Sequence, residues 1–234
     1  MASDLPPAMP MAASDYRRVQ AVMPGIESLY RCVRAICDAR LASGADILIV
    51  GAGGGREIEA LVASPKAYRL TGIDPSADML AVAREYVALA AANDRVTLVQ
   101  GVTADLPAQP AFDAATSILV MHFLPDDGSK QAYLREIRTR LTRGATYLHT
   151  DICFECREQF DALADAMREH AGLAGLGEIA DAPPAAIEKL AFGREPSAIA
   201  GEARALALFE ECGFKLIAPF YRGFWYAGWW LEAA

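Results

Sequence analysis

The chain has 234 residues, of which 53% are hydrophobic and 22% are charged, and its formal net charge is -8. This length and composition are typical of one well-filled globular domain, and they exclude a disordered or fibrous chain. An acidic chain without strong clusters of Lys and Arg is poorly suited to phosphate backbones, so we expect no nucleic-acid partner.

No apolar run is long enough to span a bilayer, and the N-terminal residues lack the basic and apolar segments of a signal peptide. The five cysteines are odd in number and irregularly spaced, which is typical of a reducing compartment. We therefore expect a cytoplasmic protein with no membrane partner.

The first fifteen residues are rich in Pro, Ala and Met, and we expect residues 1–15 to be a disordered tail. From Asp15 to Leu41, apolar residues recur at helical spacing, interrupted at Pro24-Gly25. This pattern predicts two short N-terminal helices within residues 16–44, followed by a main domain over residues 45–234.

Strands and helices alternate through most of the main domain, which predicts an α/β fold with a seven-stranded, mostly parallel, doubly wound sheet. The predicted strands are Asp46–Val50, Arg69–Ile73, Val96–Gln100, Ala114–Val120, Thr146–Asp151, Lys215–Phe220 and Gly223–Leu231. The predicted helices are Arg56–Ala63, Ala77–Ala91, Asp126–Leu141, Arg157–Ala171 and Ala203–Cys212. Residues 153–200 interrupt the alternation, and we expect a helical insertion there, between strands five and six.

A glycine-rich turn follows the first predicted strand, with Gly51, Gly53 and Gly55 at alternate positions. Glycines at such a turn let the backbone approach a ligand closely, and Asp74, which ends the next strand, can hold both hydroxyls of a ribose. A dinucleotide site would place its third glycine three residues after the second, but position 56 is Arg. The spacing therefore favours a nucleoside ligand with an amino-acid tail and no pyrophosphate.

With these motifs, the chain resembles the class I, Rossmann-like methyltransferases that use S-adenosylmethionine (SAM), over Asp46 to about Asp151 and more loosely over the terminal strands. The resemblance implies methyl transfer to a small-molecule acceptor, with S-adenosylhomocysteine (SAH) as the product. It also implies that the N-terminal helices form a lid. We expect residues 153–200 to shape the acceptor pocket, because loops on a rigid scaffold carry specificity. The cofactor-binding residues that the resemblance implies are Gly51, Gly53, Gly55, Asp74, Pro75, Met79, Val102, Thr103 and Val120.

Two positions depart from the pattern of that family. Ile49 stands where an acid usually precedes the first glycine, so the amino group of SAM needs another partner. Arg56 and Glu57 are candidates, and the alternative interpretation is that each is a solvated residue at the start of a helix. Val102 stands where an acid often binds the adenine, and Thr103 could offer its hydroxyl instead.

His122 follows the fourth predicted strand, at the edge where open α/β sheets bind their ligands. Two interpretations stay open: a general base or orienting group beside the acceptor, or a packed histidine satisfied by a backbone carbonyl. Alignment supplies much of the acceleration of methyl transfer, so a base is not obligatory.

Candidate residues for binding the acceptor come from the N-terminal helices, from the end of strand four and from the aromatic C-terminal strands. They are Tyr16, Tyr30, His122, Tyr221 and Trp225. On a continuous strand, Phe224 and Tyr226 would face one side and Trp225 the other. Packing in the core or in a homodimer interface is the alternative interpretation of these rings, and the oligomeric state stays open.

Cys153 and Cys156 form a C-x-x-C pair, but no second pair follows at matching spacing, so we expect no metal site and interpret them as ordinary thiols. Two other functions stay open. The chain also resembles carboxy-SAM synthase, whose extra carboxylate would need a cation such as Arg168, Lys189 or Arg194. A non-catalytic SAM-binding subunit is the other alternative.

Overall fold

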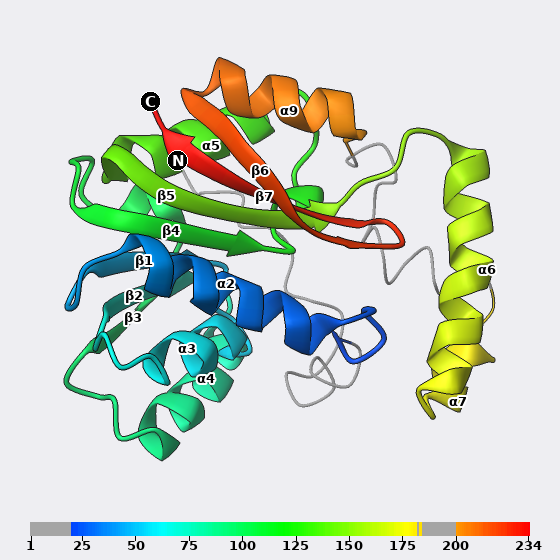
Figure 1. Cartoon of the computed structure of the whole chain (residues 1–234), viewed down its shortest axis with the longest axis horizontal. Helices are drawn as coiled ribbons and strands as arrows, with labels where there is room; N and C mark the ends of the chain where they lie inside the picture. The colour runs from blue at the N-terminus through cyan, green and yellow to red at the C-terminus, as the bar shows by residue number, and fades with distance from the viewer. Residues whose placement is uncertain (1–19, 182, 184–199) are drawn as a thin grey trace.

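The computed structural model describes residues 20–181, 183 and 200–234, and its centre is a seven-stranded sheet in the order β3-β2-β1-β4-β5-β7-β6 (Figure 1). The first five strands are parallel to their neighbours, whereas β7 pairs antiparallel with both β5 and β6. The mostly parallel sheet expected from the sequence is thus confirmed. Its strands are β1 Asp46–Val50, β2 Arg69–Asp74, β3 Val96–Gln100, β4 Phe112–Ile118, β5 Leu141–Ile152, β6 Phe214–Gly223 and β7 Tyr226–Ala233.

Helices cover both faces of the sheet. On one face, α2, α3 and α4 form a core with Ile47 and Ile49 of β1; on the other, α5 and α9 form a core with Leu48 and Val50. Alternate residues of β1 therefore serve the two cores, because successive side chains of a strand point to opposite faces. The helices are α2 Ile26–Arg40, α3 Arg56–Val62, α4 Ala77–Leu89, α5 Ser129–Arg140, α6 Arg157–Leu173, α7 Gly177–Ala180 and α9 Glu202–Glu211, with short 3-10 helices η1 Thr103–Asp105 and η2 Met121–Phe123.

Of the two expected N-terminal helices, the second corresponds to α2, and the first falls largely on residues outside the described part of the chain. α2 begins at Ile26, directly after Gly25, whose φ of 70° is a left-handed conformation that glycine adopts readily. Leu29 and Val33 of α2 are fully buried in the core that also contains Ile47 and Ile49 of β1. These contacts fix α2 against the sheet, and the lid stays a prediction. Residues 1–19, with Tyr16 and the predicted tail, lie outside the described residues.

Two predicted strand boundaries are wrong for local backbone reasons. β4 ends at Ile118 and does not reach Val120, because Leu119 has a φ of 60° and turns the chain out of the strand. β7 begins at Tyr226, because Phe224 has a φ of 51° and forms a turn with Trp225. The expected strand alternation of the residues before Tyr226 therefore does not apply.

The insertion after β5 places α6 beyond the carboxyl ends of the parallel strands (Figure 1). Its buried residues Phe160, Ala164 and Met167 recur at helical spacing and pack with Ile152 and Trp225. The described part of the insertion is helical, as expected, whereas residues 182 and 184–199, with Lys189 and Arg194, lie outside the described residues. Within the part of the chain that the structure describes, no helix is both long and apolar enough to cross a membrane.

Candidate active site

The strand order reverses between β1 and β4, and this switch point is where open α/β sheets form a ligand-binding crevice at their carboxyl ends. Gly51 lies at this point with a φ of 75°. A Cβ atom on Gly51 would come within 2.4 Å of Cγ2 of Val120, which follows β4. Glycine is therefore required here by both its conformation and the close approach of the two chain segments.

Gly53 and Asp74 join the glycine-rich turn to the end of β2. The Gly53 backbone N–H donates to Oδ2 of Asp74 at 2.9 Å, and the Ser76 backbone N–H donates to Oδ1 at 2.8 Å. Burial raises the pKa of Asp74, and these two backbone donors oppose the rise. Each carboxylate oxygen keeps further acceptor capacity, so Asp74 can also bind a diol at this edge.

The other glycine and the predicted apolar neighbour have distinct surroundings. A Cβ atom on Gly55 would lie 2.9 Å from the Tyr86 ring and 3.1 Å from the Ala83 backbone. Gly55 therefore allows α3 to pack closely against α4. Met79 is 6% exposed. A Cβ atom added to Gly53 would come within 2.8 Å of the Cβ atom of Met79. Met79 therefore lies beside the contact between Gly53 and Asp74, and Pro75 directly follows Asp74 in the chain.

The turn after β3 brings Val102 and Thr103 to the same edge of the sheet. The Val102 backbone N–H donates to Oδ2 of Asp105 at 2.8 Å, so Asp105 closes its own turn. Thr103 is 5% exposed, and its Oγ1 atom is buried with no hydrogen-bond partner in the part of the chain that the structure describes. A buried hydroxyl without a partner costs free energy, and a ligand that reached Thr103 would satisfy it.

His122 and Asp151 form a buried pair at the carboxyl ends of β4 and β5. His122 is 5% exposed, its Nδ1 atom lies 2.5 Å from Oδ1 of Asp151, and its backbone N–H donates to Oδ2 at 2.9 Å. The carboxylate accepts from Nδ1–H and so fixes a proton on Nδ1, while Nε2 makes no hydrogen bond among the described residues. The imidazole can therefore accept a proton at Nε2.

Sequence reasoning missed the polar groups that support His122. Burial alone would raise the pKa of Asp151, but His122, His149 and Lys130 hold it below its ordinary value. Lys130 is 1% exposed, and its ammonium donates to the Met121 backbone carbonyl at 2.7 Å. The sequence indicates Asp151 only as the end of a strand. Nothing local in the sequence shows that His122 will contact it or that Lys130 of α5 will lie nearby.

His149 is a structural histidine, and its protonation should make stability depend on pH. It is fully buried, and burial lowers its pKa to about 4. An unfolded His titrates near pH 6.5, so this contribution to stability is complete above that pH and is lost as the pH falls toward 4. Between pH 7.5 and 5 we expect a loss of about 2 kcal/mol in the free energy of unfolding from this group.

Urea unfolding of the parent and of His149→Phe at both pH values measures this loss. Phenylalanine suits the site because His149 packs against Phe209 and Trp229, at ring-centroid distances of 5.1 Å and 6.0 Å. The variant should lose about 2 kcal/mol less than the parent on acidification. An equal loss in both proteins would assign the acid sensitivity to other groups.

Three of the predicted acceptor-binding residues have contacts that hold the elements around the site. The Tyr30 ring lies 5.0 Å below the Arg56 guanidinium and joins α2 to α3. The Tyr221 hydroxyl donates to the Pro24 carbonyl, and Trp225, 2% exposed, stacks on Phe160 of α6. Their assignment to an acceptor pocket stays a prediction.

The C-x-x-C residues differ in exposure, since Cys153 is buried and Cys156 is exposed. Burial raises the pKa of the Cys153 thiol to about 11, which leaves it protonated and unreactive near neutral pH.

Comparisons with known proteins bear on the segment that carries the glycine-rich turn. Residues 47–144 match the model of a family described as a methyltransferase domain. Among curated proteins, none matches the chain. The comparisons do not show the likeness to carboxy-SAM synthase, and Arg168, the described candidate cation for that reaction, pairs with Asp165 of its own helix.

Solved structures share the fold over most of the chain. A possible exported protein from Bordetella parapertussis is 18% identical, with 95% of this chain and 79% of that chain covered and a TM-score of 0.69. A SAM-dependent methyltransferase from Aquifex aeolicus is 16% identical, with 96% and 100% covered and a TM-score of 0.63. An O-methyltransferase family 2 protein from Planctomyces limnophilus, in complex with apigenin, is 17% identical, with 97% and 63% covered and a TM-score of 0.61.

Proposed function

We propose that this chain, a methyltransferase whose cofactor is SAM, transfers the methyl group to a hydroxyl of a small, partly apolar acceptor. The observation that carries the proposal is the buried His122–Asp151 pair beside the switch point of the sheet. A neutral hydroxyl is a weak nucleophile that gains from loss of its proton, whereas a thioether acceptor has no proton to lose. A positioned base therefore favours an acceptor with a proton to lose, and a hydroxyl gains more from it than a thiol, which ionises at lower pH.

The residues at the carboxyl edge fit the cofactor. Gly53 leaves space beside Asp74 because it has no side chain. A Cβ atom at this position would fill that space and come within 2.6 Å of Oδ2 of Asp74. Asp74 would bind the ribose hydroxyls, and the unpartnered Thr103 hydroxyl would bind the adenine edge near Met79. When bound, SAM supplies a methyl group activated by a sulfonium.

In this proposal His122 accepts the hydroxyl proton at Nε2, and Asp151 is a positioning residue. Asp151 fixes the tautomer and orientation of the imidazole through its contact with Nδ1, and it stabilises the imidazolium that forms. Val22, Ile152 and Trp225 share one apolar cluster with α6. We expect these segments to enclose the bound acceptor and to exclude water from it.

A small-molecule acceptor is also supported by the character of the insertion. The face of α6 toward the site is apolar, with Phe160 and Met167 buried in the cluster around Trp225. The O-methyltransferase from Planctomyces limnophilus was solved with apigenin, a small-molecule ligand of that protein. Because an apolar wall suits an aromatic or aliphatic acceptor better than a phosphorylated one, we expect the acceptor to be largely uncharged.

The test is calorimetric titration with SAM and SAH, followed by a methyl-transfer screen monitored by mass spectrometry. The screen contains small phenols, aliphatic alcohols, amines and thiols. We expect both adenosyl ligands to bind and at least one hydroxyl compound to gain a methyl group. Methylation confined to amines or thiols would overturn the hydroxyl assignment, and binding of SAM without transfer to any class would favour a non-catalytic subunit.

A further inference from the structure

Glu57, the second residue of α3, is a buried carboxyl group that lacks a complete set of partners. Its side chain is 3% exposed, and its Oε1 atom is buried without a hydrogen-bond partner among the described residues. A buried carboxylate is costly unless a cation or hydrogen-bond donors compensate it. Burial raises the pKa of Glu57 to about 8, and the charge of Asp74 adds to the rise.

The placement of Glu57 brings its carboxyl group to the cofactor edge of the sheet. Glu57 lies one turn before Leu61, which is buried in the core, so the two residues share the inward face of α3. Its charge interacts with Asp74 at the end of β2 and with Tyr133 of α5, on the opposite side of the sheet. The Tyr133 hydroxyl lies 2.5 Å from Oγ of Ser117, near the end of β4. Titratable groups on β2 and α5 therefore act on Glu57 from the two elements beside the switch point.

The cationic side chains described near this edge have partners other than Glu57. The Arg56 guanidinium pairs with Glu27 and lies over the Tyr30 ring, and the Lys130 ammonium donates to the Met121 carbonyl. Ile49, on the same face of β1 as the core under α3, carries no charge. The cofactor itself has an ammonium group on its methionine moiety, and an ammonium group supplies three donors to carboxylate oxygens.

We propose that Glu57 binds the α-ammonium group of the cofactor's methionine moiety. This inference rests on the proposed function, because it needs the adenosyl ligand beside Gly53 and Asp74. It makes Glu57 the residue that distinguishes a ligand with an amino-acid tail from a plain nucleoside.

The test compares two ligands by calorimetry: SAH, which has the ammonium group, and 5′-methylthioadenosine, which lacks the amino-acid tail. Glu57→Gln should weaken SAH binding about tenfold or more, the effect of losing a charge-assisted contact, and leave methylthioadenosine binding unchanged. The matched control is Glu59→Gln, which makes the same substitution at an exposed position on the same helix and should change neither affinity.

A second measurement uses the proton that Glu57 must release. At pH 7 the free carboxyl group is largely protonated, so binding SAH as the ion pair releases close to one proton to the buffer. The groups that face it are Arg56 on its own helix, Asp74 on β2 and Tyr133 on α5. The heat of SAH binding should therefore depend on the ionisation enthalpy of the buffer in the parent and not in Glu57→Gln.

The outcomes separate this inference from the proposed function. If the parent binds neither ligand, the cofactor site itself is wrong. If the parent binds both and Glu57→Gln weakens both equally, Glu57 only shapes the glycine-rich turn, and the ammonium assignment is overturned. Unchanged binding of both ligands, or equal proton release by parent and variant, would overturn it as well. Circular dichroism of Glu57→Gln checks that the variant is folded.

Discussion

His122→Ala is expected to lower kcat for methyl transfer by about three orders of magnitude while the Kd for SAH stays within about twofold of the parent value. The reason is that the imidazole is proposed to act on the acceptor's proton and not on the cofactor. The variant also leaves Asp151 buried without its main donor. The measurements are steady-state kinetics with a hydroxyl acceptor identified in the screen and calorimetry with SAH.

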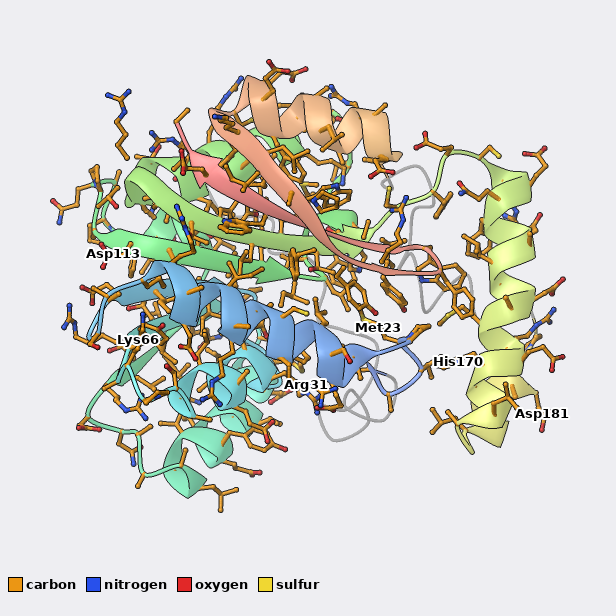
Figure 2. All side chains as sticks on the ribbon, viewed as in Figure 1. Met23, Arg31, Lys66, Asp113, His170 and Asp181 are labelled. Atoms are coloured by element: carbon orange, nitrogen blue, oxygen red, sulfur yellow. The ribbon has the colours of Figure 1, made fainter. Side chains whose placement is uncertain are left out.

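Imidazole rescue separates a base from a packing residue. Imidazole added to the medium should restore part of the activity of His122→Ala, because it can accept the proton in place of the missing ring. Asp151→Asn should also lower kcat, since an amide can stabilise the wrong tautomer of His122. His170→Gln on α6 (Figure 2) is the control and should keep the parent kcat. If His122→Ala kept full activity, alignment alone would carry the reaction, and His122 would be only a wall of the site.

The second large effect is expected for Asp74→Ala, which should raise the Kd for SAH roughly 300-fold. Asp74 is proposed to bind two ribose hydroxyls, and each charge-assisted hydrogen bond contributes about 1.5–3 kcal/mol. The variant also loses the acceptor of the Gly53 N–H, which holds the glycine-rich turn near β2. Calorimetry with SAH and with methylthioadenosine measures the effect, and both ligands should lose affinity because both contain the ribose.

The control for Asp74→Ala is Asp113→Asn. Asp113 lies at the amino end of β4, away from α6, where its carboxylate accepts from the Asp46 backbone N–H (Figure 2). This variant should bind SAH as the parent does. Thermal unfolding of both variants shows whether any loss of binding reflects loss of the fold. A folded Asp74→Ala protein with parent affinity would contradict the placement of the ribose.

Local patterns in the sequence were sufficient for the sheet and for the first part of the site. The apolar run Asp46–Val50 and the glycines after it predict a buried strand and a tight turn, because a doubly buried strand needs apolar residues on both faces and a left-handed turn needs glycine. Asp74 could likewise be placed, since it ends the neighbouring strand at the same edge.

Tertiary packing decided the rest of the site. Asp151 meets His122 only because β4 and β5 are adjacent and parallel, a pairing between residues 29 positions apart. Tyr221 and Trp225 were predicted from composition, but their contacts with Pro24 and Phe160 depend on how the hairpin, the N-terminal turn and α6 come together.

Glu57 shows the same division between sequence and structure. Its position after the glycine-rich turn makes it a candidate in the sequence, but a carboxylate at the start of a helix is usually exposed to solvent. Only the packing of α3 on the sheet buries it to 3% exposure and leaves Oε1 without a partner among residues 20–181, 183 and 200–234. The sequence by itself determined which residues stand at the ends of the strands, because backbone conformation and burial pattern are local properties. The tertiary structure alone decided which of their charges lose water and which neighbours they meet, because burial and charge pairing depend on residues distant in the chain.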